Sequence, residues 1–358
     1  FMLDFDQVLQ NRYVFNIKTG KKYFNNFEVL NSNEKYNDLR YTIDGDQWNK
    51  FNWLEEPSES YESLLMERCK QLRDKYPYLV LYYSGGSDSE TVLQSFIKAN
   101  IHLDEIVINV FKIKDDDPPL LDVELAVMKL KEIYKPHLPK TKITINKLSR
   151  DMFLNFNKKQ MWVDSTYNGT LGHFRRMPLT VAQELGQKVK INSNNVGHIF
   201  AETKPHLRKK EDGYYAIWSV TLAVASHWAE WFFTSLELPK LHIKQCHLVK
   251  NYFKNFNPQE TNIIELGAVR EQLIRSCRYL FDNRYQPDKT VGLLKDLKTP
   301  TEDGLVIDHL KKHDQESYDV YLNATVKPIL NSATNKTLLD KEKGNLRLIR
   351  SEEYYLGN

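Results

Sequence analysis

From residue 59 to residue 111, short continuous apolar runs alternate with segments whose apolar side chains recur at helical spacing. The runs 78–83 and 105–111 are too short for helices and rich in strand-forming residues, which predicts strands buried on both faces of a sheet. The segments 59–75 and 90–98 carry apolar residues three or four positions apart, which predicts amphipathic helices. This order of strand, helix and strand is typical of a βαβ unit.

The same alternation continues further along the chain. It predicts a helix over 122–134, a strand over 142–148, a helix over 179–186 and a strand over 188–192. Strands that alternate with helices of this length indicate an α/β fold with a doubly wound parallel sheet. Ligands of such sheets bind beyond the carboxyl ends of the strands.

The flanking regions have a different pattern. Residues 1–60 contain aromatic-rich stretches separated by Asn, Gly and Asp, which predicts a small β-rich N-terminal attachment. Residues 206–218 resemble a hairpin with Asp212 and Gly213 in its turn, and 226–256 has the length and apolar content of one or two helices. We therefore predict a mainly helical C-terminal region and four parts: 1–60, a nucleotide-binding α/β domain at 61–200, a hairpin and helical substrate region at 201–300, and a C-terminal extension at 301–358.

Composition narrows the class of protein only slightly. The 50 basic and 47 acidic residues leave a net charge of +3, so any contact with nucleic acid would depend on a local basic surface and not on the overall charge. Oligomerisation stays open. The cysteines Cys69, Cys246 and Cys277 form no CxxC pair, which favours a reducing compartment. No apolar run reaches the roughly 20 residues that span a bilayer, and the first residues lack a secretory pattern. We expect a cytoplasmic protein without a membrane segment.

The segment Ser84-Gly85-Gly86-Ser87-Asp88-Ser89 joins the predicted strand 78–83 to the following helix. Glycines permit positive φ and close backbone approach, so several N–H groups can surround one concavity. The helix N-terminus adds partial positive charge and the serines add hydroxyl donors. This pattern predicts a site for a di- or triphosphate. The alternative is a tight turn in which Ser87 or Asp88 merely caps the helix.

The sequence Leu81-Tyr82-Tyr83-Ser84-Gly85-Gly86-Ser87-Asp88-Ser89 resembles the SGGxDS signature of the PP-loop ATP pyrophosphatase superfamily, over roughly residues 75–200. The resemblance implies an adenine nucleotide alpha-hydrolase-like fold. It also implies an enzyme that cleaves ATP between the α and β phosphates, forms AMP and adenylates an acceptor. We expect transfer from that adenylate to a nitrogen nucleophile. The segments 199–208 and 238–247 are similar to phage-type members grouped with the phosphoadenosine phosphosulfate reductases.

Carried onto this chain, the resemblance implies that Ser84, Gly85, Gly86, Ser87, Asp88 and Ser89 hold the β and γ phosphates of ATP. Asp88 would also help to place Mg²⁺. Val110 and Phe111, at the end of the second predicted strand, would lie next to adenine. ATP and Mg²⁺ are thus the expected cofactors, and the acceptor substrate is unidentified.

Cleavage of the α–β bond builds negative charge on the leaving pyrophosphate, which calls for a fixed cation. Lys204 and Arg208 are the candidates best placed by topology, with Asp88 the third predicted catalytic residue. The alternative is that these basic residues only solvate a hairpin. Arg175 with Arg176 is a further option.

Other candidates follow from residue chemistry alone. Glu202 or the acidic loop Asp115-Asp116-Asp117 offers carboxylates to Mg²⁺. His206 is a candidate acid, base or phosphate contact. Zinc is disfavoured, because His242 and His247 are five positions apart and the other histidines of this half, His198, His206 and His227, have no cysteine pair beside them.

Two rival functions remain open. A sulfur-transfer or phosphosulfate-reductase-like enzyme would need a reactive thiol, for which Cys246 and Cys277 are the candidates. A nucleotide-binding sensor or interaction module would keep the loop and lack turnover.

Overall fold

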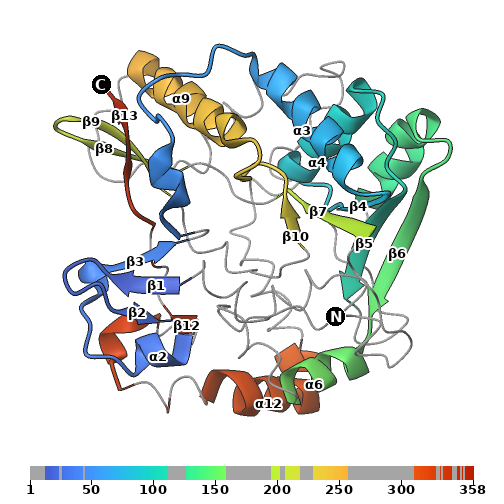
Figure 1. Cartoon of the computed structure of the whole chain (residues 1–358). Helices are drawn as coiled ribbons and strands as arrows, with labels where there is room; N and C mark the ends of the chain where they lie inside the picture. Colours follow the sequence, from blue (N-terminus) through green and yellow to red (C-terminus); the bar gives the residue numbers. More distant parts are fainter. Residues whose placement is uncertain are drawn as a thin grey trace.

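The structure is a computed structural model, and its largest element is a five-stranded sheet (Figure 1). The described residues are 13–23, 26–42, 45–111, 126–158, 195–201, 206–217, 229–256, 310–327, 331, 334–340, 345–346, 349 and 351–358.

All five strands of the central sheet run parallel. The order across the sheet is β10-β7-β4-β5-β6. The strands are β4 (Tyr78–Tyr82), β5 (Glu105–Phe111), β6 (Lys142–Leu148), β7 (Val196–Phe200) and β10 (Ala229–Trp231). The predicted strands 78–83, 105–111 and 142–148 are therefore confirmed, as is the α/β class with a parallel sheet.

The order of the strands reverses at β4. From β4 the chain adds β5 and then β6 on one side, and it returns to add β7 and then β10 on the other side. In open parallel sheets, the crevice at such a reversal is the usual place for a ligand. The loop that follows β4 therefore begins at the topological switch point.

Two strands of the central sheet were not predicted. β7 contains Gly197 and His198, which interrupt its apolar pattern, and β10 has only three residues inside a segment predicted to be helical. Both strands take their place from pairing in the sheet, because Trp231 pairs with Phe200 and Leu81 with Ile199. The predicted helix 179–186 and strand 188–192 lie outside the described residues.

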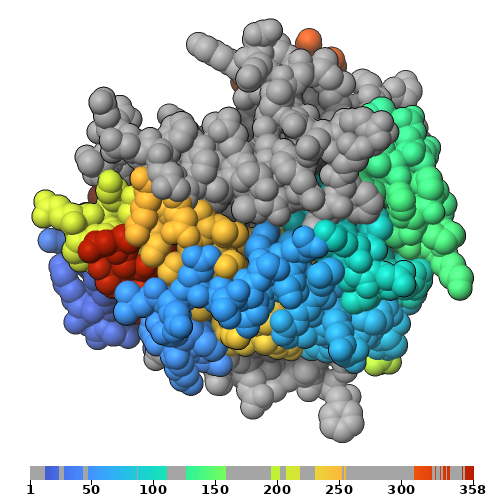
Figure 2. All heavy atoms as spheres, turned by 90° about the horizontal axis from the view of Figure 1, so that it is seen from above, coloured from blue at the N-terminus to red at the C-terminus, as the bar shows by residue number. Residues whose placement is uncertain are grey.

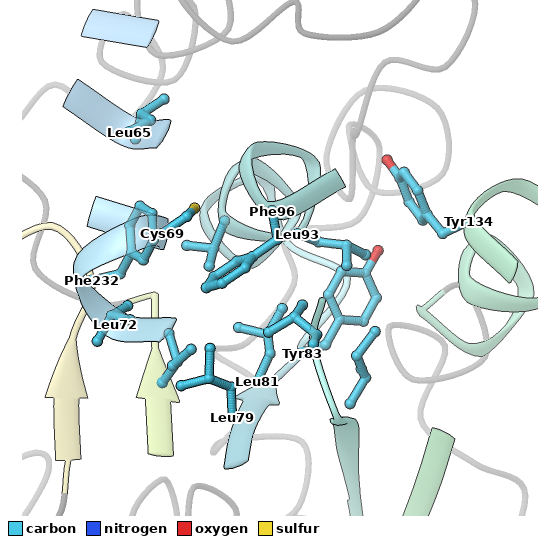
Figure 3. Packing of buried hydrophobic residues seen from close by; sticks show 14 of the residues in the cluster. Leu65, Cys69, Leu72, Leu79, Leu81, Tyr83, Leu93, Phe96, Tyr134 and Phe232 are labelled. Carbon is cyan, nitrogen blue, oxygen red and sulfur yellow. The ribbon is translucent and has the colours of Figure 1, made fainter. Parts of the chain in front are cut away.

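Helices α3 (Tyr61–Lys75) and α4 (Ser87–Lys98) confirm the helices predicted from spacing, and α9 (Pro239–Phe256) falls in the predicted helical segment 226–256. The apolar faces of α3 and α4 meet one face of the sheet in a single core (Figure 3). Leu241 of α9 belongs to the same core. Leu72 of α3, Phe96 of α4 and Leu81 of β4 are fully buried there. Residues 126–137 are also helical and pack against this core, which agrees with the end of the predicted helix 122–134.

The remaining elements form smaller units. β1 (Tyr13–Asn16), β2 (Lys22–Tyr23) and β3 (Leu39–Thr42) make an antiparallel sheet near the N-terminus. The hairpin β8 (His206–Lys210) and β9 (Gly213–Ile217) is joined by β13 (Tyr354–Gly357) from the end of the chain. The other described elements are α2 (Asn26–Leu30), α6 (Arg150–Lys158), α12 (Gln315–Tyr321), β11 (Leu339–Asp340) and β12 (Asn345–Leu346).

The predicted hairpin turn is one residue out of place. Glu211 and Asp212 form the turn, and Gly213 is the first residue of β9, with φ +137°. A Cβ on Gly213 would lie 2.8 Å from the backbone oxygen of Gly357. Glycine is therefore required here by the close approach of β13, which the local sequence does not reveal.

Candidate phosphate-binding site

The candidate site is the loop from Ser84 to the first turn of α4. It lies at the carboxyl end of β4, where the strand order reverses. Ser84 is exposed, whereas Gly85 is buried, so the loop turns one side outward and rests its other side on the protein. The structure thus places the predicted loop residues together at a strand end, as a phosphate site in a parallel sheet requires.

Gly85 has a backbone conformation that favours glycine. Its φ is +70°, in the left-handed region. A Cβ at this position would lie 2.7 Å from the Cβ and 2.9 Å from the Cα of Ala126. Two independent constraints, the dihedral angle and the neighbouring backbone, therefore select glycine at the centre of the loop.

The serine hydroxyls close the loop on itself. The Ser84 amide donates to the Ser89 Oγ at 3.2 Å, and the two hydroxyl oxygens of these serines are also 3.2 Å apart. The Ser89 hydroxyl donates to the Gly86 carbonyl at 3.0 Å. These bonds fix the curvature of the loop around the start of α4.

The N-cap residue of α4 is Gly86, which supplies no side-chain cap hydrogen bond. The first N–H groups of a helix have no partner within the helix, and they carry the positive end of its dipole. Asp88 is on this first turn and is partly exposed. The arrangement can attract an anion to the amides and offers one carboxylate beside it.

A buried ion pair lies directly behind the loop. Glu90, in the first turn of α4, accepts from the Lys129 Nζ at 2.9 Å and from the Tyr134 hydroxyl at 2.6 Å. Glu90 is 1% exposed and Lys129 6%. Burial first, and the Glu90 charge second, raise the pKa of Tyr134, which keeps its hydroxyl a donor.

The sequence carries a signal for the pairing of Lys129 with Glu90 that lies outside the motif at Ser84–Ser89. Lys129 stands among Ala126, Leu130 and Ile133, at the spacing of one helical face. A single charged residue on an otherwise apolar face indicates a buried partner.

The opposite face of the sheet carries aromatic and polar side chains next to the loop. Tyr82, Phe200 and Trp231 lie in one row across β4, β7 and β10, and the rings of Tyr82 and Phe200 stack with centroids 4.5 Å apart. The Tyr82 hydroxyl is 3.1 Å from His198 Nδ1. Burial lowers the pKa of His198 to about 4, so its imidazole is neutral near pH 7.

Val110 and Phe111, predicted to lie near adenine, are at the end of β5. The Val110 side chain is 4% exposed and packs within the core against the helices. An adenine contact at this residue would therefore come from its main chain. The side chain of Phe111 lies outside the described part of the structure, and the adenine assignment stays a prediction.

The guanidinium of Arg208 is paired with a carboxylate. Arg208 lies on β8, and its guanidinium donates to Glu353 at 2.6 Å. The hairpin and β6 lie at opposite ends of the molecule in two views (Figure 1 and Figure 2). Its catalytic role stays a prediction that these contacts do not support. Lys204, Glu202, residues 115–117, residues 175–176, and the side chain of His206 lie outside the described residues.

The described histidines of α9 have structural surroundings. His242 lies between the rings of Trp48 and Trp53, and His247 Nε2 is 2.9 Å from the Trp53 carbonyl oxygen. Cys246 is fully buried, and burial raises the pKa of its thiol, which does not favour a reactive thiolate. Cys277 and His227 lie outside the described residues.

Comparison with known proteins adds no relative. No family model matches the chain, and neither curated proteins nor solved structures contain a match. Within the described segments, no helix is long and apolar enough to cross a membrane.

Proposed function

We propose that this protein is an ATP-dependent, AMP-forming enzyme that binds the β and γ phosphates of ATP at Ser84–Ser89 and adenylates an acceptor. The observation that carries the proposal is the loop itself, which follows a central parallel strand at the switch point with Gly85 at φ +70°. Its likeness to the SGGxDS signature supports the reaction class.

In the proposed reaction, an acceptor oxygen attacks the α phosphorus, the bond from that phosphorus to the bridging oxygen breaks, and pyrophosphate leaves. The loop amides and the start of α4 would hold the departing phosphates, because both present positive partial charge. The hydroxyls of Ser84 and Ser89, now bonded to each other, would turn toward phosphate oxygens. A nitrogen nucleophile would then displace AMP from the acceptor.

The residues at the loop fit Mg²⁺ that arrives with the nucleotide. Mg²⁺ is commonly held by one or two carboxylates together with phosphate oxygens. Asp88 supplies one carboxylate, and the described residues contain no group of three or more metal-binding side chains that would hold the ion alone. Bound there, Mg²⁺ would neutralise charge on the phosphates.

The test uses ATP labelled at the α phosphate. The protein is incubated with Mg²⁺ and this ATP, with and without a small-molecule cell extract, and AMP, ADP and adenylated species are separated. We expect AMP that depends on the extract and is lost in Asp88→Ala. Asp151→Ala is the matched control, because Asp151 is an exposed aspartate in the first turn of another helix, α6.

Release of ADP in place of AMP would refute the reaction class. Unchanged AMP formation in a folded Asp88→Ala variant would refute the role of the loop. Tight ATP binding without AMP formation, with or without the extract, would favour the rival function of a nucleotide-binding sensor that lacks turnover.

A further inference from the structure

The helical segment 126–134 touches both the candidate loop and the helix that follows it. Ala126 packs against Gly85, and its backbone fills the space that a Cβ on Gly85 would need. One turn later, Lys129 reaches Glu90 of α4 at 2.9 Å. The same segment therefore contacts both the centre of the loop and the helix that follows it.

The second contact is a network of buried polar groups. Tyr134 donates to Glu90 at 2.6 Å and accepts from the Gln94 amide at 2.9 Å. Tyr83, the residue before Ser84, lies on the same side of α4 as Tyr134 (Figure 3). The Tyr83 hydroxyl is buried without a hydrogen-bond partner among the described residues. Burial first, and the charge of Glu90 second, raise the pKa of Tyr83, so this side chain lies close to the network at the strand end where the loop starts.

A buried ion pair of this kind has one favourable geometry. A charge that loses its partner in a dry site must be neutralised or must gain water. Water can enter a close-packed interior only if neighbouring groups move. Glu90 is the first residue after the loop, and its amide donates to the Gly86 carbonyl at 3.0 Å. Movement of Glu90 is therefore transmitted directly to Gly86.

We propose that Lys129 and Glu90 are positioning residues for the phosphate loop. Their buried ion pair holds segment 126–134 against α4, and Ala126 then keeps Gly85 in the conformation in which the loop amides face a phosphate. The inference rests on the proposed function for its ligand, and it adds two residues outside the SGGxDS signature to the site.

The first experiment compares ATP affinity in three folded variants. Lys129→Met should weaken ATP binding by about tenfold or more, because small displacements of positioning groups have large effects. Glu90→Gln/Lys129→Met should recover most of that affinity, since the glutamine still accepts from Tyr134 and no buried charge is left unpaired. Arg68→Met is the matched control, because Arg68 is also fully buried and bonded to two carboxylates, Glu230 and Glu237.

A merely structural role would lower the stability of Lys129→Met and Arg68→Met alike without a selective effect on ATP. Near wild-type affinity in folded Lys129→Met would overturn the proposal, and so would equal weakening in Arg68→Met. If Lys129→Met does not fold, Glu90→Gln replaces it, because that variant leaves Lys129 without its carboxylate.

The second experiment needs no nucleotide. Amide hydrogen exchange of the peptide covering residues 84–94 should be faster in Lys129→Met than in the wild type, and unchanged in Arg68→Met. Equal exchange in all three proteins would overturn the positioning role. If the wild-type chain binds neither ATP nor pyrophosphate, the proposed function fails, whereas the exchange experiment still decides whether this ion pair positions the loop.

Discussion

Helices α3 and α4 lie side by side on one face of the sheet, yet they begin in different ways. The N-cap of α3 is Ser60, whose side chain accepts from the Ser63 amide at 3.0 Å. The N-cap of α4 is Gly86, which has no side chain to offer. Both helices have acidic residues in the first turn: Glu62 in α3, and Asp88 and Glu90 in α4.

The difference separates a structural helix start from a candidate binding site. At α3 the Ser60 side chain satisfies one of the N–H groups that have no partner within the helix. Such a cap stabilises the helix and needs no ligand. At α4 the N-cap residue has no side chain that could accept from these amides, and the preceding loop contains Gly85 in a conformation that is strained for any other residue. A helix end of this kind is best completed by an anion.

Gly85→Ala should have the largest effect on the α4 side. The left-handed φ and the overlap with Ala126 together should destabilise the fold by about 3 kcal/mol and abolish ATP binding. Gly20→Ala is the control, because Gly20 has nearly the same φ, +71°, and nothing within 4 Å of an added Cβ. Chemical denaturation gives the loss of stability in each variant. The difference between the two losses is the part caused by the close approach of Ala126 to residue 85. Equal losses in the two would show that Ala126 imposes no constraint.

Acidification should weaken the strands that carry the loop. The pKa of His198 is about 4 in the folded protein, below its ordinary value of 6.5. The unfolded chain therefore binds the proton more readily than the folded protein. The stability that neutral His198 contributes is fully present above pH 6.5 and is lost as the pH falls toward 4. The loss should reach about 3 kcal/mol.

Denaturation of the wild type and of His198→Gln across this pH range measures the effect. The difference between the two proteins removes the contribution of His247, whose pKa is also lowered by burial. Parallel curves for the two proteins would contradict a neutral, buried His198.

Ser60→Ala tests the α3 side of the comparison. Loss of the cap should destabilise the protein by about 1 kcal/mol, because the Ser63 amide loses its acceptor. ATP affinity should stay at the wild-type value, as measured by calorimetry. A marked fall in affinity would mean that the two helix starts are not independent.

Gly86→Ser should have the smallest effect on stability. Gly86 has φ −79° and ψ 159°, the extended conformation that N-cap residues adopt. A serine there can cap α4 as Ser60 caps α3, changing stability by only a few tenths of a kcal/mol. Its hydroxyl would compete with phosphate for the amides, so we expect ATP binding to weaken by about fivefold. Unchanged affinity would indicate that the first turn of α4 does not contact the ligand.

Much of the central fold could be predicted from local pattern. The apolar runs at 78–83, 105–111 and 142–148 identified three of the strands, because a strand buried on both faces needs continuous apolar residues. The helices α3 and α4 could be predicted from the spacing of their apolar residues, and the loop Ser84–Ser89 from its glycines, since each pattern reflects a local requirement of the backbone. The position of the candidate loop therefore followed from the sequence by itself.

Only the tertiary structure decided the strand order and the surroundings of the loop. β7 is a strand because it pairs with β4, and β10 is a strand because it pairs with β7. Gly197 in β7 and the short length of β10 obscure the local strand pattern. Glu90 meets Lys129, 39 residues away, and Arg208 meets Glu353, 145 residues away. Pairing and burial between distant segments depend on how the chain returns in space, and the spacing of neighbouring residues does not contain that information.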